Sequence, residues 1–440
     1  MRKRSKVAVM MTVLAMACVL LPSAAEASAA TNAGSGSFYV YTGSKPLAQI
    51  PPGTVLKTRT VSYHVAGIAL PIEVVQLLYR STGELGQPTT NVTSVIKPPL
   101  SVGSARAVSY QSFYDSLNPA DEPSKQIAGG VSLGGLIPDA ESLLIAPLLL
   151  QGFTVIVSDI EGQAADFGAG PVSGMNTLDS IRAATSSGLT GLDKDTQVGM
   201  LGYSGGAIAT GWAAQLAPSY APDVNRELVG AAEGGVLVDP IHNLTYVSGS
   251  LIWSGVLPIA LIGIARAFDI DLTPYLSSEG LHLFDTLQEA SIVNVLGQYP
   301  GLTWAQLVKP QYANPDSIPV LVRTANKLNM GSAASPTVPM FIGQGANGVI
   351  EGTPGNKPGI GPGDGVMIAG DVRSLARQFC ASGTAVDYTQ YNALSHVTSV
   401  PVWAPAALAW LDDRFAGLSA PNDCSQIAPG NSLAPAKVAG

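Results

Sequence analysis

The residues best suited to chemistry lie in the segment 202–206, which reads Gly-Tyr-Ser-Gly-Gly. A short apolar run, 198–201, leads into this segment, and a run of small residues typical of a helix, 207–217, follows it. A strand that turns sharply into a helix exposes a serine hydroxyl at the end of the strand, and such a turn leaves no room for side chains beside the serine. We therefore predict that Ser204 is a nucleophile.

The same pattern also occurs at 130–134, where it is centred on Ser132. A chain with 48 glycines produces such matches by chance. No apolar strand leads into this second match, and Pro138 interrupts the segment after it. We interpret Ser132 as a loop residue; for Ser204 the competing interpretation is an ordinary glycine-rich turn.

A serine nucleophile needs a base to remove its proton and a carboxylate to hold that base. In chains with this turn the order is serine, acid, histidine. The sequence has four histidines. His64 precedes Ser204, whereas His242 and His282 fall in a segment without strand–helix alternation. His396 lies between a predicted strand and the last predicted helix, so we predict that it is the base.

The acid should follow the apolar run 338–342, where a long segment rich in glycine and proline begins. Asp364 and Glu351 are the two candidates. Asp364 lies between two glycines, which would allow a loop carboxylate to reach inward, and we prefer it.

Acyl transfer also needs N–H donors for the oxyanion that develops in the transition state. The residue after the nucleophile, Gly205, supplies one such donor. We expect the second from Asp159, in the loop that follows the predicted strand 153–157. A plain turn is the alternative for this loop.

Strands and helices alternate from residue 153 to residue 235 and again after residue 326. Alternation of this kind predicts an α/β fold with a mostly parallel sheet covered by helices on both faces. Before it, the runs 73–80 and 91–96 predict an antiparallel hairpin. The remaining strands and helices are expected at 108–113, 140–150, 175–184, 228–232, 372–379, 385–391 and 404–415.

Residues 236–325 do not alternate and predict helices broken by prolines, over 251–268, 281–296 and 304–308. One interpretation is a helical subdomain buried against the sheet. The other is a cap over Ser204 whose apolar face meets acyl chains or a lipid surface. In that case Leu257 and Ile262 would line the acyl pocket.

The first 27 residues have the pattern of an export signal: basic residues, the apolar run 7–21 and a small-residue cleavage site. A retained membrane anchor is the alternative, but the run is short for a span. Cys380 and Cys424 should pair in an oxidising compartment. The formal net charge of −8 argues against a nucleic-acid partner, and no motif predicts a metal or an organic cofactor.

Together these residues resemble the secretory lipases, the family of the fungal lipase A enzymes with many actinobacterial members. The resemblance runs from about residue 38 to residue 424, and its specificity lies in the joint order and spacing of several short stretches. These are Ser-Asp-Ile-Glu-Gly at 158–162, Gly-Tyr-Ser-Gly-Gly-Ala at 202–207, Gly-Asp-Gly-Val-Met at 363–367, Ser-His at 395–396, and Asp-Arg-Phe-Ala-Gly at 413–417.

The resemblance implies an α/β-hydrolase core, a helical lid between its halves, and hydrolysis of lipid carboxylic esters. It places the nucleophile at Ser204, the acid at Asp364, the base at His396, and the oxyanion donors at Asp159 and Gly205. A disulfide between Cys380 and Cys424 is also typical of the family. We therefore expect a signal peptide at 1–27, core halves at 28–235 and 326–424, the lid at 236–325, and a flexible tail at 425–440.

One departure from the family pattern concerns the acid. In simpler members the acid follows its strand after a few residues, whereas here a long glycine- and proline-rich segment intervenes before Asp364.

The sequence therefore predicts a secreted serine esterase or lipase that acts through an acyl-enzyme on Ser204, with association with the cell envelope left open. An acyltransferase or a short-chain esterase on the same fold is the alternative. A non-catalytic secreted binding protein is the hypothesis from a different class. The sequence makes no prediction about oligomeric state, acyl-chain length or positional preference.

Overall fold

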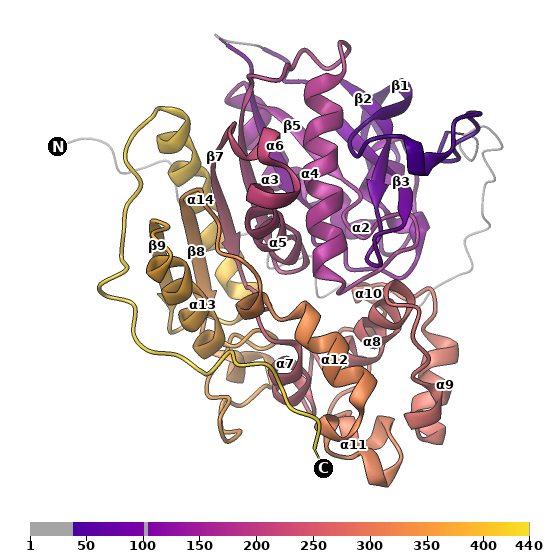
Figure 1. The fold of residues 1–440 in the computed structure, drawn as a ribbon, viewed down its shortest axis with the longest axis vertical. Coiled ribbons are helices and arrows are strands. Elements are labelled where there is room, and N and C mark those ends of the chain that lie inside the picture. Colours follow the sequence, from indigo (N-terminus) through magenta and orange to yellow (C-terminus); the bar gives the residue numbers. More distant parts are fainter. Residues whose placement is uncertain (1–37, 101–103, 440) are drawn as a thin grey trace. The chain divides into compact units, whose positions relative to one another are not determined.

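A computed structural model describes residues 38–100 and 104–439; the predicted signal peptide lies outside them. The described chain is built on one nine-stranded sheet in the order β1-β2-β3-β5-β4-β6-β7-β8-β9 (Figure 1). No helix within the described ranges is long and apolar enough to cross a membrane.

The first strands of the sheet are antiparallel. β1 (Val55–Val65), β2 (Ile68–Thr82) and β3 (Pro88–Ile96) form a meander, and Val74 of β2 lies opposite Ile96 of β3. The predicted hairpin is therefore confirmed.

The rest of the sheet is parallel, as the strand–helix alternation predicts. It begins at β5, which pairs with β3 on its antiparallel side. Its strands are β4 (Arg106–Gln111), β5 (Thr154–Ser158), β6 (Gln197–Tyr203), β7 (Leu228–Gly234), β8 (Met340–Gly345) and β9 (Val386–Tyr391).

Helices cover both faces of this sheet because its strands are apolar on both sides. In β6, Val198 and Met200 enter one hydrophobic cluster, whereas Leu201 and Tyr203 enter another. The first cluster includes α4 (Gly170–Ser186), α5 (Gly205–Tyr220) and α13 (Ala369–Ala381), and the second includes α3 (Ser142–Leu150) and α14 (His396–Phe415). Short helices α1 (Pro123–Ile127), α2 (Leu136–Ala140) and α6 (Pro222–Asn225) lie in the connections.

The segment between β7 and β8 is helical and forms its own hydrophobic cluster; we call it the helical insertion. It comprises α7 (Pro240–Val247), α8 (Val256–Ala267), α9 (Ser278–Thr286), α10 (Ile292–Val295), α11 (Trp304–Leu307) and α12 (Pro319–Leu328). These helices gather at one end of the sheet (Figure 1).

Two of the predicted helices differ most from the structure. The single helix expected over 281–296 is wrong, because α9 ends at Thr286 and a capping box at Ser291 starts α10. The last helix begins at His396 rather than at residue 404, since Ser395 caps it and the helix continues through Pro401 and Pro405.

The described residues of the predicted flexible tail, 425–439, make specific contacts with the rest of the chain. The last residues run along α13 and then reach α12 of the helical insertion, as the yellow segment of Figure 1 shows. Arg377 of α13 donates to the Ile427 carbonyl at 2.7 Å, and Asn326 of α12 bonds the backbone of Ala436 in both directions. Ile427 is buried in the core. Residues 424–439, which we call the C-terminal strap, therefore tie the core to the insertion.

Cys380, on α13, and Cys424, at the start of the strap, form the disulfide that the sequence predicts. The two residues are 44 positions apart. In the chain-entropy model a loop of this size stabilises the folded state by about 4 kcal/mol. We expect the Cys380→Ser, Cys424→Ser double variant to lose a stability of this order in denaturant unfolding; a midpoint equal to that of the wild type would contradict it.

Candidate active site

Ser204 lies in a sharp strand-to-helix turn that requires glycine at positions 202 and 206. β6 ends at Tyr203 and α5 starts at Gly205, so Ser204 alone joins them, with φ 53° and ψ −120°. A Cβ at position 202 would lie 2.2 Å from the Gly206 carbonyl oxygen, and one at position 206 would lie 2.1 Å from the Gln111 carbonyl oxygen. The glycines are therefore required, and the strained backbone holds the hydroxyl in place.

Three side chains from distant parts of the sequence form one hydrogen-bonded chain. The Ser204 Oγ lies 2.8 Å from His396 Nε2, and His396 Nδ1 lies 2.8 Å from Asp364 Oδ2. Asp364 is fully buried and His396 is almost fully buried. The structure thus brings together the predicted nucleophile, base and acid.

The Asp364 carboxylate is held by further donors. Its Oδ1 accepts from the backbone N–H groups of Val366 and Met367 at 3.0 and 2.7 Å, and its Oδ2 accepts from Gln344 Nε2 at 2.9 Å. These bonds satisfy a buried charge and fix its direction toward the imidazole. Glu351, the alternative acid, instead bonds Trp253 and the backbone of Val397.

His396 is held on several sides. Its backbone N–H donates to the Asp364 carbonyl at 2.7 Å, and the Tyr203 hydroxyl donates to its carbonyl at 2.7 Å. Burial is the largest single influence on the pKa of the His396 imidazolium and lowers it. The charge and hydrogen bond of Asp364, together with the charges of Glu351 and Asp115, raise it, and the resulting pKa lies above its usual value. The imidazolium that forms on accepting a proton is therefore stabilised.

The prediction of Asp159 as an oxyanion donor needs correction. The backbone N–H of Asp159 donates to the Val92 carbonyl at 3.0 Å, and its carboxylate accepts from the backbone and the hydroxyl of Ser124. Its amide is thus already used. The sheet order explains the difference, because β5, which precedes Asp159, is separated from β6 by β4.

Asp115, in the loop that follows β4, occupies the position expected of the second donor. β4 is the direct neighbour of β6, and a Cβ built on Gly205 would lie 1.7 Å from Asp115 Oδ1. In the described chain neither the Asp115 amide nor the Gly205 amide donates to a protein acceptor. Chain order alone gives no signal for Asp115, since only the neighbouring strands identify it.

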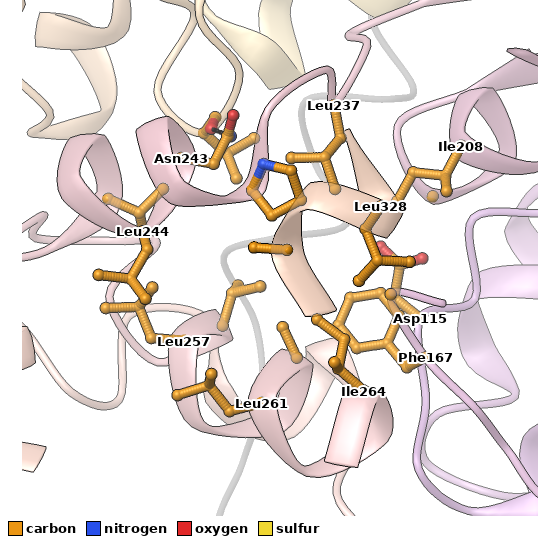
Figure 2. Close-up of a pocket in the computed structure, with 18 of the residues that line it drawn as sticks. Asp115, Phe167, Ile208, Leu237, Asn243, Leu244, Leu257, Leu261, Ile264 and Leu328 are labelled. Carbon is orange, nitrogen blue, oxygen red and sulfur yellow. Dashed lines mark hydrogen bonds between the residues drawn. The ribbon is translucent and has the colours of Figure 1, made fainter. Parts of the chain in front are cut away.

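An apolar cavity of about 110 Å³ adjoins Ser204, Gly205 and Asp115. Figure 2 shows side chains from several segments around it, with Leu257, Leu261 and Ile264 coming from α8. The polar residues among those lining it are few, and they include Asn243 and Thr324 at the α7 and α12 helices.

Leu257 lines this cavity as predicted, but Ile262 does not. Both are buried in the helical insertion. Cavity-lining residues on α8 follow the spacing 256, 257, 260, 261 and 264, which is one face of a helix. Ile262 therefore packs within the insertion, where its burial is structural.

Within residues 38–100 and 104–439, no cluster of three or more His, Cys, Asp or Glu side chains has the arrangement of a metal site.

Residues 130–423, more than half of the chain, match the family model for secretory lipases. The chain belongs to this family. Lipase 5 of Candida albicans is 30% identical over 85% of this chain and 80% of its own length. A Mycobacterium tuberculosis protein named as a probable inactive lipase is 32% identical over 83% of this chain and 79% of its own length.

Among solved structures, Candida antarctica lipase A in its closed state aligns with a TM-score of 0.77 at 25% identity, covering 94% of this chain and 93% of that one. The predicted α/β-hydrolase fold is thereby confirmed. As a secretory lipase, the chain is a carboxylic ester hydrolase. One relative is named as probably inactive, so family membership alone does not establish a serine mechanism. Support for that mechanism comes instead from the hydrogen bond between Ser204 and His396.

Proposed function

We propose that this secretory lipase is exported and hydrolyses lipid esters through an acyl-enzyme on Ser204. The observation that carries the proposal is the continuous chain from Ser204 Oγ through His396 to Asp364, placed beside an apolar cavity. The export signal pattern, the disulfide and the family's description as secretory support export.

In the first half of the reaction, His396 Nε2 takes the proton of Ser204 as Oγ bonds to the ester carbonyl carbon. Asp364 holds the proton on Nδ1 and stabilises the imidazolium. The amides of Gly205 and Asp115 donate to the oxyanion. When the carbonyl re-forms, the bond to the alcohol breaks and His396 passes its proton to the leaving oxygen.

In the second half, water replaces the alcohol. His396 takes a proton from water while the water oxygen bonds to the acyl carbon, and the bond to Ser204 Oγ then breaks. The proton on His396 returns to Ser204, and the carboxylic acid leaves. An alcohol in place of water would give acyl transfer by the same steps.

The lipid part of the proposal depends on the cavity. Each methylene of an acyl chain that leaves water for an apolar site contributes about 0.8 kcal/mol. An acetyl group would gain little from the apolar side chains of the helical insertion, whereas a longer chain would contact them. The names of the Candida relatives as lipases agree with this preference.

A panel of nitrophenyl esters from acetate to palmitate, run beside an emulsified triglyceride, tests the proposal. We expect kcat/KM to rise with chain length beyond acetate and the triglyceride to be cleaved. Activity confined to acetate would reduce the protein to a short-chain esterase.

Leu257→Asn should depress long-chain hydrolysis far more than acetate hydrolysis, because it places a polar amide in the cavity wall. Ile262→Asn is the matched control: it changes a buried residue of the same helix that does not line the cavity. The measurement is the ratio of palmitate to acetate kcat/KM in variants that remain folded. Equal falls for both substrates in Leu257→Asn would show that the cavity does not hold the acyl chain.

A further inference from the structure

Glu351 makes a bridge that the reaction described above does not use. It ends the short 3₁₀ helix Gly348–Glu351 and is 5% exposed. One carboxylate oxygen accepts from Trp253 Nε1 at 2.6 Å, and the other accepts from the backbone N–H of Val397 at 2.9 Å. Trp253 belongs to the helical insertion, whereas Val397 directly follows the base His396 in α14. A single side chain therefore joins the insertion to the helical turn that carries the base.

Trp253 connects the same bridge to the catalytic imidazole. Its ring lies edge-on to the His396 ring, with centroids 5.0 Å apart and an interplanar angle of 82°. Trp253 also lines the apolar cavity. Its orientation therefore affects both the cavity wall and the space beside the imidazole.

The loop of the catalytic acid packs against this bridge as well. Gly365, which follows Asp364, has φ +133°, and a Cβ there would lie 2.6 Å from Glu351 Oε2 and 2.9 Å from Trp253 Nε1. A side chain at 365 would push the bridge apart. The acid, the base and the insertion thus meet around one carboxylate.

We propose that Glu351 is a positioning residue for His396. By accepting hydrogen bonds from Trp253 and from the first turn of α14, it fixes the position of His396 relative to the helical insertion. The expected effect of Glu351 on turnover rests on the proposed function. Its expected effect on the position and titration of the His396 imidazole does not. The role is separate from that of Asp364, which bonds the imidazole directly.

The chemistry of the bridge requires a carboxylate. Two N–H donors converge on Glu351, and a carboxylate accepts from both of them. Glutamine has nearly the same shape but only one acceptor oxygen, so Glu351→Gln must face one donor with its own NH₂ group. Glutamine also removes a negative charge near the base.

That charge affects the titration of His396. The carboxylates of Asp364, Glu351 and Asp115 all raise the pKa of the imidazolium against the lowering effect of burial, with Asp364 the largest of the three. The Tyr203 hydroxyl, also packed against this residue, donates to its backbone carbonyl and carries no charge. Removing the Glu351 charge should therefore lower the pKa of His396, and the imidazole should stay neutral to lower pH.

The kinetic test compares Glu351→Gln and Trp253→Phe with the wild type on a nitrophenyl acetate substrate. We expect Glu351→Gln to lower kcat roughly 10- to 100-fold, because small displacements of catalytic groups have effects of this size. KM should change little, and the acidic limb of the kcat/KM profile should move to lower pH. Trp253→Phe keeps an aromatic ring beside His396 but removes the N–H group that donates to Glu351. We therefore expect kcat to fall while the acidic limb of the kcat/KM profile stays at its wild-type pH.

Glu233→Gln is the matched control. Glu233, on β7, is fully buried, its side-chain oxygens have no hydrogen-bond partner in the described chain, and burial raises its pKa to about 8. The substitution therefore replaces a buried glutamate without removing a negative charge in the acidic pH range. It should leave both kcat and the acidic limb near wild-type values. The thermal unfolding midpoint of each variant distinguishes a loss of the fold from a displacement of His396 in a folded protein.

Histidine ¹³C NMR supplies a readout that does not need turnover. The His396 resonance, assigned by its loss in His396→Asn, should titrate at lower pH in Glu351→Gln than in the wild type. If no variant and no wild-type sample cleaves esters but this shift occurs, the proposed function fails and the positioning role stands. Wild-type kcat in Glu351→Gln, or an unmoved His396 titration, would overturn the positioning role.

Discussion

Replacing Ser204 with alanine will lower ester turnover by about 10⁶-fold, as loss of the nucleophile does in a comparable serine hydrolase. The variant should fold normally, because removing one hydroxyl leaves only a small space and Gly202, Gly205 and Gly206 still permit the turn. The measurement is kcat on nitrophenyl acetate together with the thermal unfolding midpoint.

Ser132→Ala is the matched control for this experiment. Ser132 also lies in a Gly-x-Ser-x-Gly pattern, but its Oγ accepts from Gln126 Nε2 and the Gly135 amide within a loop. We expect nearly wild-type turnover. An active Ser204→Ala beside an inactive Ser132→Ala would show that the nucleophile is the other serine.

Replacing Asp364 with asparagine will lower turnover by about 10⁴-fold, the size found when a triad carboxylate is neutralised. Asparagine would lose the charge that stabilises the imidazolium, and its NH₂ group could turn toward Nδ1 and favour the wrong tautomer. The bonds from the backbone N–H groups of Val366 and Met367 to the other side-chain oxygen would keep the loop in place. The effect should therefore appear in kcat with the fold unchanged.

The comparison with Glu351→Gln decides between the two acids. Because Glu351 bonds Trp253 and Val397 and does not bond the imidazole, its loss should cost far less than that of Asp364. If kcat falls less in Asp364→Asn than in Glu351→Gln, the assignment of Asp364 as the acid is contradicted.

The nucleophile and the base could be predicted because local sequence determines them. The glycines around Ser204 have a steric cause that one short segment contains, and His396 was selected by its place after the last strand among four histidines. Asp364 was harder to choose, since Glu351 lies in the same long segment. Only the distances to the His396 nitrogens separate the two carboxylates.

The second oxyanion donor could not be predicted because it depends on which strands are neighbours. Asp159 and Asp115 each follow a strand, but β4 lies between β5 and β6, which places Asp115 beside Gly205. Ile262 was misplaced for a different reason. The run 251–268 is apolar apart from Ser254 and Arg266, so its periodicity does not show which face of α8 lines the cavity.

The start of the last helix and the contacts of the chain's end depend on features that the sequence pattern does not show. The last helix begins at the base itself rather than at residue 404, because Ser395 caps α14 and the helix accommodates Pro401 and Pro405. At the end of the chain, Ile427 is buried and the C-terminal strap bonds α13 and α12. Contacts of this kind join residues far apart in sequence, and no local pattern encodes them.

The central claim is that esters are cleaved through a covalent intermediate on Ser204, and a fluorophosphonate probe tests it most directly. Mass spectrometry of the digested adduct should find the label on the peptide containing Ser204, with loss of esterase activity in proportion to labelling and no adduct in Ser204→Ala. Label on a different serine, or full esterase activity in protein labelled at Ser204, would contradict the account.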